Sequence, residues 1–187
     1  MEDYLGLIMR LAEAFGKVGL DYAFTGALAA SFYGLPRTTT DVDLLIHVSD
    51  RTAKSKLVSA LEMAGLRVDG GEVDRAFSSG YRVATFADRR TAYSVDVIFS
   101  DRKLLKRAGT VGGVQTFFQA PEDLISAKLR RIKATLSEER VLKDKEDVRA
   151  ILKFTNVNVE AVRKKAKRET TLVILEALMA DENDLRR

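Results

Sequence analysis

The stretch YAFTGALAASFYGLPRTTTDVDLLIHV, residues 22–48, determines how the rest of the chain is interpreted. It opens with a short β-prone run that stops at Gly26, continues with helix formers, and reaches a glycine–leucine–proline break at residues 34–36. From Asp41 the polarity alternates with period 2, so one face of this segment is apolar and the other begins with Asp41 and Asp43. The pattern predicts a strand, a glycine turn, a short helix, a basic loop and a second strand.

The spacing of Asp41 and Asp43 has a chemical meaning. Side chains two residues apart on a strand point to the same side and lie about 6.6 Å apart, at ~3.3 Å per residue. Two carboxylates placed in this way can share hard cations such as Mg²⁺, including the metal pairs, about 3.5–4 Å apart, that serve phosphoryl transfer. Because carboxylates on one side repel each other, they require solvent or a metal. We therefore expect Asp41 and Asp43 to bind one or two Mg²⁺ ions.

A third acid, Asp96, lies in the middle of a strand-like run. The runs at residues 81–86 and 91–99 are predicted to form an antiparallel hairpin. An aspartate between Val95 and Val97 is unusual, because Asp is disfavoured in strands and costly to bury without a partner. Asp96 either faces solvent on an exposed sheet face or is a third functional carboxylate.

Gly26-Ala27, followed after thirteen residues by Asp41-Val42-Asp43, resembles the signature of the DNA polymerase β-like nucleotidyltransferase superfamily. The chain is similar to its small stand-alone prokaryotic members, which are related to the abortive-infection (type IV toxin) nucleotidyltransferases. The resemblance implies an α/β (α+β) nucleotidyltransferase fold, with a mixed, partly antiparallel sheet, packed helices and a C-terminal helical part. It also implies that Asp96 is a metal ligand or the general base. Those relatives usually carry Ser or Gly at the position of Ala27.

Nucleotide contacts are expected around these acids. Gly26 would let the backbone approach the phosphates at a helix N-terminus, and Arg37 would neutralise their charge. The helices PEDLISAKLRR and LKDKEDVRAIL extend the resemblance, which implies that a lysine on the first and an aspartate on the second approach the nucleotide. The complete set of predicted contacts is Gly26, Ala27, Arg37, Thr40, Lys128, Asp144 and Asp147.

Taken alone, the charges on these two helices are typical of a solvated amphipathic surface. If the resemblance holds, Lys128 and Arg131 would instead face the three acids and form the far wall of a cleft. In either case Lys128 is expected to be a surface side chain, whose loss would leave the melting temperature nearly unchanged.

The composition limits the remaining possibilities. The 187 residues are predicted to form a catalytic core at 1–119 and a helical region at 120–187. The absence of cysteine excludes disulfides, and the single histidine, His47, makes a histidine zinc site implausible. No apolar run reaches the ~20 residues of a membrane helix, and the N-terminus lacks a signal-peptide layout, so a cytoplasmic protein without a membrane partner is expected. The net charge of +4 is compatible with nucleotide or RNA.

Other segments follow from periodicity and capping. Helices are predicted at residues 3–17, from a cap at Ser49 or Asp50 to 64, at 101–107, from Pro121, and at 138–154, 158–168 and 169–180. Short strands are predicted at 66–68 and at 110–119, the latter as a strand or hairpin, while 69–79 is either a loop or one helical turn. The basic run at 163–168 is either a solvated helix face or a contact surface for RNA phosphates.

Two functions are compatible with these features. The first is a Mg²⁺-dependent nucleotidyltransferase that moves a nucleoside monophosphate from an NTP, such as ATP, to RNA or tRNA, a protein or a small molecule. Such an enzyme could be a toxin with a cognate antitoxin. The second, favoured by Ala27, is a non-catalytic nucleotide-binding, RNA-binding or regulatory member of the same fold. A Rossmann domain is excluded, because residues 26–34 contain no G-x-G-x-x-G motif.

Overall fold

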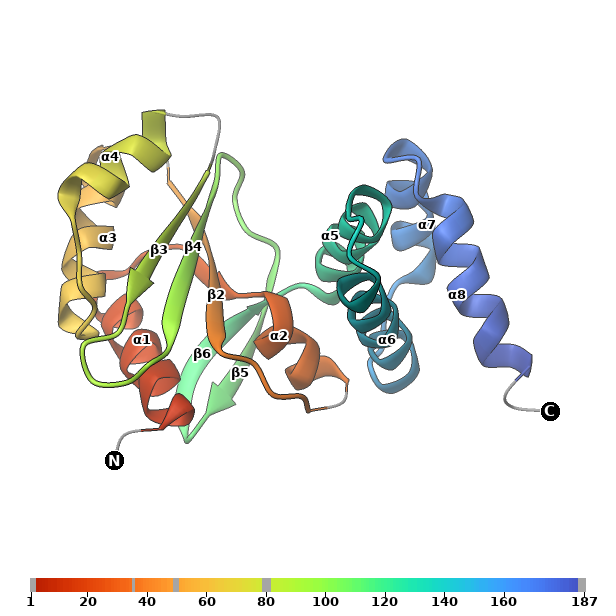
Figure 1. Ribbon diagram of the computed structural model, residues 1–187, viewed down its shortest axis with the longest axis horizontal. Helices are drawn as coiled ribbons and strands as arrows, with labels where there is room; N and C mark the ends of the chain where they lie inside the picture. Colours follow the sequence, from red (N-terminus) through yellow and green to blue (C-terminus); the bar gives the residue numbers. More distant parts are fainter. Residues whose placement is uncertain (1–2, 35, 49–50, 79–81, 185–187) are drawn as a thin grey trace. The chain divides into compact units, whose positions relative to one another are not determined.

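A computed structural model describes residues 3–34, 36–48, 51–78 and 82–184 (Figure 1). Two compact units are present. The first comprises the described residues up to Leu28 and those from Thr38 to Gln119, and the second comprises Ala29–Arg37 together with the described residues from Ala120 onward. The boundary between the units therefore falls within a helix, and the second unit includes a short segment from the N-terminal half of the chain.

The first unit is built on a six-stranded sheet with the strand order β3-β4-β2-β1-β6-β5. Its strands are β1 (Tyr22–Phe24), β2 (Asp41–His47), β3 (Val83–Ala87), β4 (Ser94–Ser100), β5 (Lys106–Val111) and β6 (Val114–Gln119). The pairs β2–β4 and β1–β6 are parallel, and the other neighbours are antiparallel. The predicted mixed, partly antiparallel sheet is confirmed.

One face of this sheet forms the core of the first unit. On β2 and β4 every second residue is buried, including Val42, Leu44, Val95 and Val97. Helices α1 (Tyr4–Val18), α3 (Arg51–Met63) and α4 (Gly70–Ser78) lie on one side of the sheet in Figure 1. Because side chains alternate along a strand, the acids of β2 and β4 project from the opposite face.

Local signals explain where the helices begin and end. The side chain of Asp3 caps α1 by accepting a hydrogen bond of 2.9 Å from the backbone N–H of Gly6. Gly19 ends α1 in the left-handed conformation, with φ of 64°, as its position in the sequence predicted. The predicted cap of α3 at Ser49 or Asp50 lies outside the described residues.

The second unit is helical. It contains the later part of α2 (Gly26–Tyr33) and the helices α5 (Pro121–Ala134), α6 (Glu138–Phe154), α7 (Val159–Arg168) and α8 (Leu172–Asp184). The end of α2 is held at the C-terminal cap of α6, because the hydroxyl of Thr155 donates a 2.5 Å hydrogen bond to the carbonyl of Tyr33. A Cβ at Gly34 would lie only 2.8 Å from the Cβ of Ala150.

The structure corrects three local predictions. The predicted helix at 101–107 is wrong: the chain is irregular there until β5 begins at Lys106, whose ammonium group lies 2.6 Å from Asp21 and 4.2 Å from the ring centroid of Phe117. These long-range contacts outweigh local helix propensity. The strand at 66–68 is reduced to one bridge between Leu66 and Asp88. The ambiguous segment after residue 69 is a helix of nine residues, α4.

In the described ranges, none of the helices combines the length and the apolarity that a membrane crossing requires.

Candidate active site

The three predicted acids project from the same face of the sheet. In the parallel pairing of β2 with β4, Asp43 lies directly opposite Asp96, and Asp41 lies opposite Ser94. All three aspartates are half-buried, whereas their strand neighbours on the core side are fully buried. The prediction that Asp96 shares a face with the other two acids therefore agrees with the register.

Gly26 shapes the surroundings of Asp43. Its φ is +59°, and a Cβ built on it would lie 1.7 Å from the Oδ2 atom of Asp43. Only glycine tolerates both this backbone conformation and this approach. The carboxylate of Asp43 thus rests against the backbone at the N-terminus of α2, while the backbone N–H of Thr25 donates to the carbonyl of Asp43 at 3.0 Å.

Two threonine hydroxyls hold the other two acids. Thr39, in the loop before β2, donates to Oδ1 of Asp41. Thr85, on β3, lies opposite Asp96 in the antiparallel register and donates to its Oδ1 atom at 2.6 Å. The hydroxyl groups of Thr39 and Thr85 therefore set the orientation of the Asp41 and Asp96 carboxylates.

The predicted acids have the chemistry that Mg²⁺ prefers, since all three offer carboxylate oxygens on the same face of the sheet. Across the described parts of the chain, however, no three Asp, Glu, His or Cys side chains are arranged closely enough to hold one ion. Asp43 and Asp96 are direct neighbours across two strands, and Asp41 is two residues from Asp43. A site for Mg²⁺ at these residues therefore stays a prediction.

In the second unit, four predicted nucleotide contacts form one charge network. The ammonium group of Lys128 lies 3.1 Å from Oδ1 of Asp144 and 2.6 Å from Oδ2 of Asp147. Arg131 donates to both oxygens of Asp144, and Arg37 lies 3.2 Å from Asp147. The sequence resemblance had singled out these residues, but it did not predict that they bind one another.

The expectation that Lys128 is a surface side chain is wrong. Only 1% of Lys128 is exposed, and Asp144 and Asp147 are buried as well. Burial alone would raise the pKa of the Asp144 carboxyl, but hydrogen bonds and charges from Arg131 and Lys128 outweigh it and lower the pKa below its ordinary value. The network therefore holds α5 and α6 together as a buried set of charges.

Arg37 and Thr40 have different surroundings. The Nε atom of Arg37 is buried and has no hydrogen-bond partner among the described residues, although its guanidinium is paired with Asp147. Thr40 is exposed and lies immediately before β2. The role of both residues in nucleotide binding stays a prediction.

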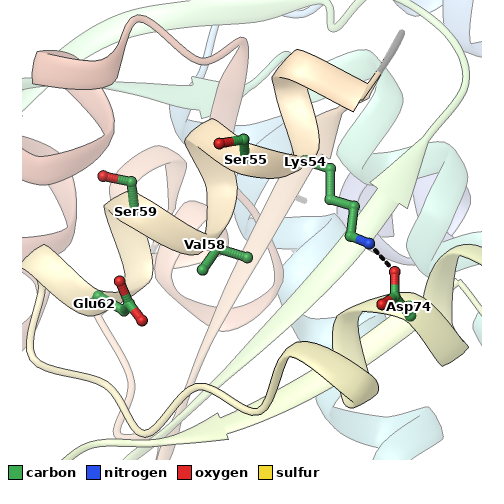
Figure 2. A pocket seen from close by; sticks show the side chains of 6 residues that line it. All are labelled: Lys54, Ser55, Val58, Ser59, Glu62 and Asp74. Atoms are coloured by element: carbon green, nitrogen blue, oxygen red, sulfur yellow. Dashed lines mark ion pairs between the residues drawn. The ribbon is translucent and has the colours of Figure 1, made fainter.

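A pocket of about 730 Å³ between α3 and α4 contains none of the predicted site residues (Figure 2). Lys54 of α3 is paired there with Asp74 of α4, and the rest of the lining comes from the exposed side of α3. This ion pair partly neutralises the pocket, which does not resemble an acidic metal site.

No family model matches the sequence, and no curated protein matches it either. Solved structures do match. An antigenic nucleotidyltransferase-like protein from Paracoccidioides brasiliensis has a TM-score of 0.62 at 16% identity, with 96% of this chain and 93% of that chain covered. The antibiotic-resistance factor ANT(2'')-Ia has a TM-score of 0.59 at 14% identity, with 97% and 96% covered. The same factor in complex with adenylyl-2''-tobramycin has a TM-score of 0.57 at 15% identity, with 95% and 98% covered.

These similarities confirm that the chain has the nucleotidyltransferase fold, as the glycine turn and the Asp-x-Asp strand predicted. At these identities the similarity extends to the fold, and the chemistry has to be argued from the residues of this chain.

The sequence interpretation missed Thr39 and Thr85. Thr39 stands two residues before Asp41, a spacing typical of local threonine hydrogen bonds, and this signal was available. Thr85 could not be found in this way, because it meets Asp96 only through the register of β3 with β4.

Proposed function

We propose that the chain is a Mg²⁺-dependent nucleotidyltransferase, which moves a nucleoside monophosphate from an NTP to an acceptor hydroxyl and releases pyrophosphate. The observation that carries this proposal is the packing of the Asp43 carboxylate against Gly26, next to Asp96 on the same face of a nucleotidyltransferase-type sheet. The glycine brings this carboxylate to the N-terminus of α2, where a metal ion held by Asp43 would lie beside backbone N–H groups that can bind a triphosphate.

Asp41, Asp43 and Asp96 are the residues that would hold Mg²⁺. When bound, the cation would offset the charge of the triphosphate and make its α-phosphorus more susceptible to attack. Thr85 occupies one oxygen of Asp96 and leaves the other available.

In the proposed reaction Asp96 accepts the proton of the acceptor hydroxyl. The hydroxyl oxygen forms a bond to the α-phosphorus while the bond from that phosphorus to the bridging oxygen breaks. The electron pair leaves with pyrophosphate. The protein contributes mainly positioning and charge, as is general for phosphoryl-type transfers.

The backbone at Gly26 and Ala27, at the N-terminus of α2, is proposed to bind phosphate oxygens. Arg37, with its unpartnered Nε–H, and Thr40 are proposed to add donors. Lys128, Asp144 and Asp147 remain proposed nucleotide contacts on the strength of the family resemblance, in addition to their role in the charge network.

The wider context is also part of the proposal. ANT(2'')-Ia has been solved with adenylyl-2''-tobramycin, and this supports ATP as the nucleotide to test first. A chain without cysteine suits the reducing cytoplasm. A role as a toxin with a cognate antitoxin follows from the family resemblance and makes co-purification with a neighbouring gene product worth testing.

The test is transfer of label from each α-labelled NTP, in the presence of Mg²⁺, to total cellular RNA and to a protein extract. We expect transfer by the wild type, loss of transfer with chelator, and loss in Asp43→Asn and Asp96→Asn. Asp101→Asn is the matched control, because Asp101 is an exposed acid that pairs with Arg82. Absence of transfer from all four NTPs would overturn the proposal.

Ala27 favours one alternative, a non-catalytic nucleotide- or RNA-binding protein, because it lacks the hydroxyl that a serine at this turn would offer to a phosphate. That function predicts calorimetric binding of an NTP without any label transfer. If Ala27→Ser then produced transfer, the missing hydroxyl would be the cause.

A further inference from the structure

A pocket of about 370 Å³ lies beside the third acid, at the β3 edge of the sheet. Thr85 lines this pocket and donates a hydrogen bond to Asp96, so the pocket begins where the proposed general base is held. Its volume lies at the lower end of the range for small-molecule sites, about 300–1,000 Å³, and suits one group of nucleotide size.

Two arginines line the pocket, and backbone pairing places both of them. The backbone N–H of Arg67 donates to the carbonyl of Ala87 at 2.9 Å, and that of Arg89 donates to the carbonyl of Gly65 at 3.2 Å. Ala87 is two residues from Thr85, or about 6.6 Å along the strand. The backbone of both arginines is thus held at the β3 end of the sheet, and Thr85 of the same pocket reaches Asp96 on the neighbouring strand β4.

The side chains of both arginines are exposed and available. Neither forms an ion pair or a side-chain hydrogen bond with any residue in the described part of the chain. This distinguishes them from Arg10 and Arg131, whose guanidinium groups are paired with Asp88 and Asp144.

The pocket also contains two acids, Asp69 and Glu72. Asp69 is already engaged, because its Oδ1 atom accepts from the backbone N–H of Gly71 at 2.9 Å and its Oδ2 atom lies 3.9 Å from Arg75. Two arginines and two acids thus line the pocket, and because Asp69 is already engaged, the guanidinium groups of Arg67 and Arg89 can pair with an added anion.

We infer that this pocket is the acceptor subsite, and that the acceptor is a sugar hydroxyl carried on a phosphate ester, that is, a nucleotide unit. This inference rests on the proposed function. The hydroxyl lies at Asp96, and the phosphate lies on Arg67 and Arg89, whose planar guanidinium groups bind phosphate oxygens in pairs. The nucleotide unit is either free or the terminal residue of an RNA chain.

The test is binding of AMP, by calorimetry, and of a short fluorescein-labelled oligoadenylate, by anisotropy, at about 50 mM and about 200 mM salt. The wild type is compared with the double variant Arg67→Ala/Arg89→Ala. The control is Lys17→Ala/Lys56→Ala, which removes the same charge from exposed positions on α1 and α3.

We expect the double variant to bind at least one probe about tenfold or more weakly, and to lower the salt slope for the oligonucleotide by about 2, or about 1 for each arginine. The control should match the wild type. Loss of AMP binding identifies a free nucleotide as a sufficient acceptor, and loss confined to the oligonucleotide identifies an RNA terminus. Either result supports the inference.

Equal binding by the double variant and the control would overturn the inference, as would a wild type that binds neither probe. Label transfer separates this failure from failure of the proposed function. If the wild type transfers label and the double variant does so with an unchanged KM for the acceptor, the function stands and the acceptor subsite is wrong. If the wild type transfers no label to any acceptor, the proposed function fails, and the inference, which rests on it, fails too.

Discussion

A single methyl group added at Gly26 is expected to displace the Asp43 carboxylate. The φ of +59° at Gly26 makes any other residue strained, and the Cβ position there coincides with the carboxylate of Asp43. We predict that Gly26→Ala lowers label transfer by about hundredfold, since a catalytic group displaced by about 1 Å typically costs this much. The rate of transfer and the affinity for Mn²⁺ are the measurements.

Gly19→Ala is the matched control for this prediction. Gly19 has a similar φ of +64°, but nothing lies within 4 Å of its Cβ position. Backbone strain should lower the free energy of unfolding of Gly19→Ala by about 1–2 kcal/mol, as it does in Gly26→Ala, but Gly19→Ala should keep its label-transfer activity. If the two variants lost activity equally, strain and not displacement of Asp43 would explain the result.

Thr85 permits a test of positioning at the third acid. Its hydroxyl donates to Asp96 from an exposed position on β3, so Thr85→Val removes the hydrogen bond without opening a cavity. We predict that kcat falls about tenfold, which is the lower end of the range for loss of a hydrogen bond to a charged group. The KM for the NTP and the melting temperature should be unchanged. Thr85→Ser should restore kcat. A Ser variant as slow as the Val variant would contradict a role for the hydroxyl.

Between elements of the second unit, a network of charges joins α5 and α6. Lys128→Ala would leave Asp144 and Asp147 buried with less compensation, because it removes the ammonium group that pairs with both carboxylates, while Arg131 and Arg37 stay beside them. We predict a loss of about 3–5 kcal/mol in the free energy of unfolding, measured by urea denaturation.

Lys143→Ala is the control within α6. Lys143 lies 2.6 Å from Glu139, but both side chains are largely exposed, so its removal should cost less than about 0.5 kcal/mol. Similar losses in the two variants would mean that burial does not set the strength of the Lys128 interactions.

Elements with strong local signals could be predicted from the sequence, and elements formed by distant pairing could not. The signals for the end of α1 at Gly19, the start of α5 at Pro121 and the alternation of β2 each lie within a few residues of sequence. The corresponding helix ends and strand were predicted to within one or two positions. The 101–107 segment has a helical composition, yet β5 is held by Asp21 and by β6. The contact of Thr85 with Asp96 and the burial of Lys128 could not be predicted for the same reason. Both depend on partners in another strand or helix, and a lysine in a helix is predicted to be solvated until those partners are known.

At the scale of the whole molecule, acid should weaken the fold through buried carboxylates in both units. Burial alone would raise the pKa of the Asp88 carboxyl, but hydrogen bonds from Arg10 and Thr91 and the charge of Arg10 lower it overall. The pKa of Asp144 is lowered as well. A carboxyl with a lower pKa in the folded state stabilises the protein above its unfolded pKa of about 3.9, and this stabilisation is lost as the pH falls through the folded value.

We therefore predict that the free energy of unfolding is level near neutral pH and falls steadily below about pH 4. The measurement is urea denaturation at a series of pH values. Asp88→Asn should be less stable at neutral pH by about 1.5–3 kcal/mol, because it removes the charge of a carboxylate that accepts two hydrogen bonds from Arg10, and it should show a shallower decline in acid. A decline as steep as that of the wild type would exclude Asp88 as a source of the acid sensitivity.

The segment at residues 29–37 bears on how such a chain can be inherited. It belongs to the second unit, yet its codons lie among those of the first. Tyr33 contacts Thr155, which is 122 residues further along the chain, and Arg37 contacts Asp147. A single recombination breakpoint at the codon for Gln119 would give a chimera whose 29–37 segment came from one parent and whose α6 came from the other. Exchange of either unit between related genes therefore requires further breakpoints or matched changes on both sides of the breakpoint, and the two units are expected to descend together.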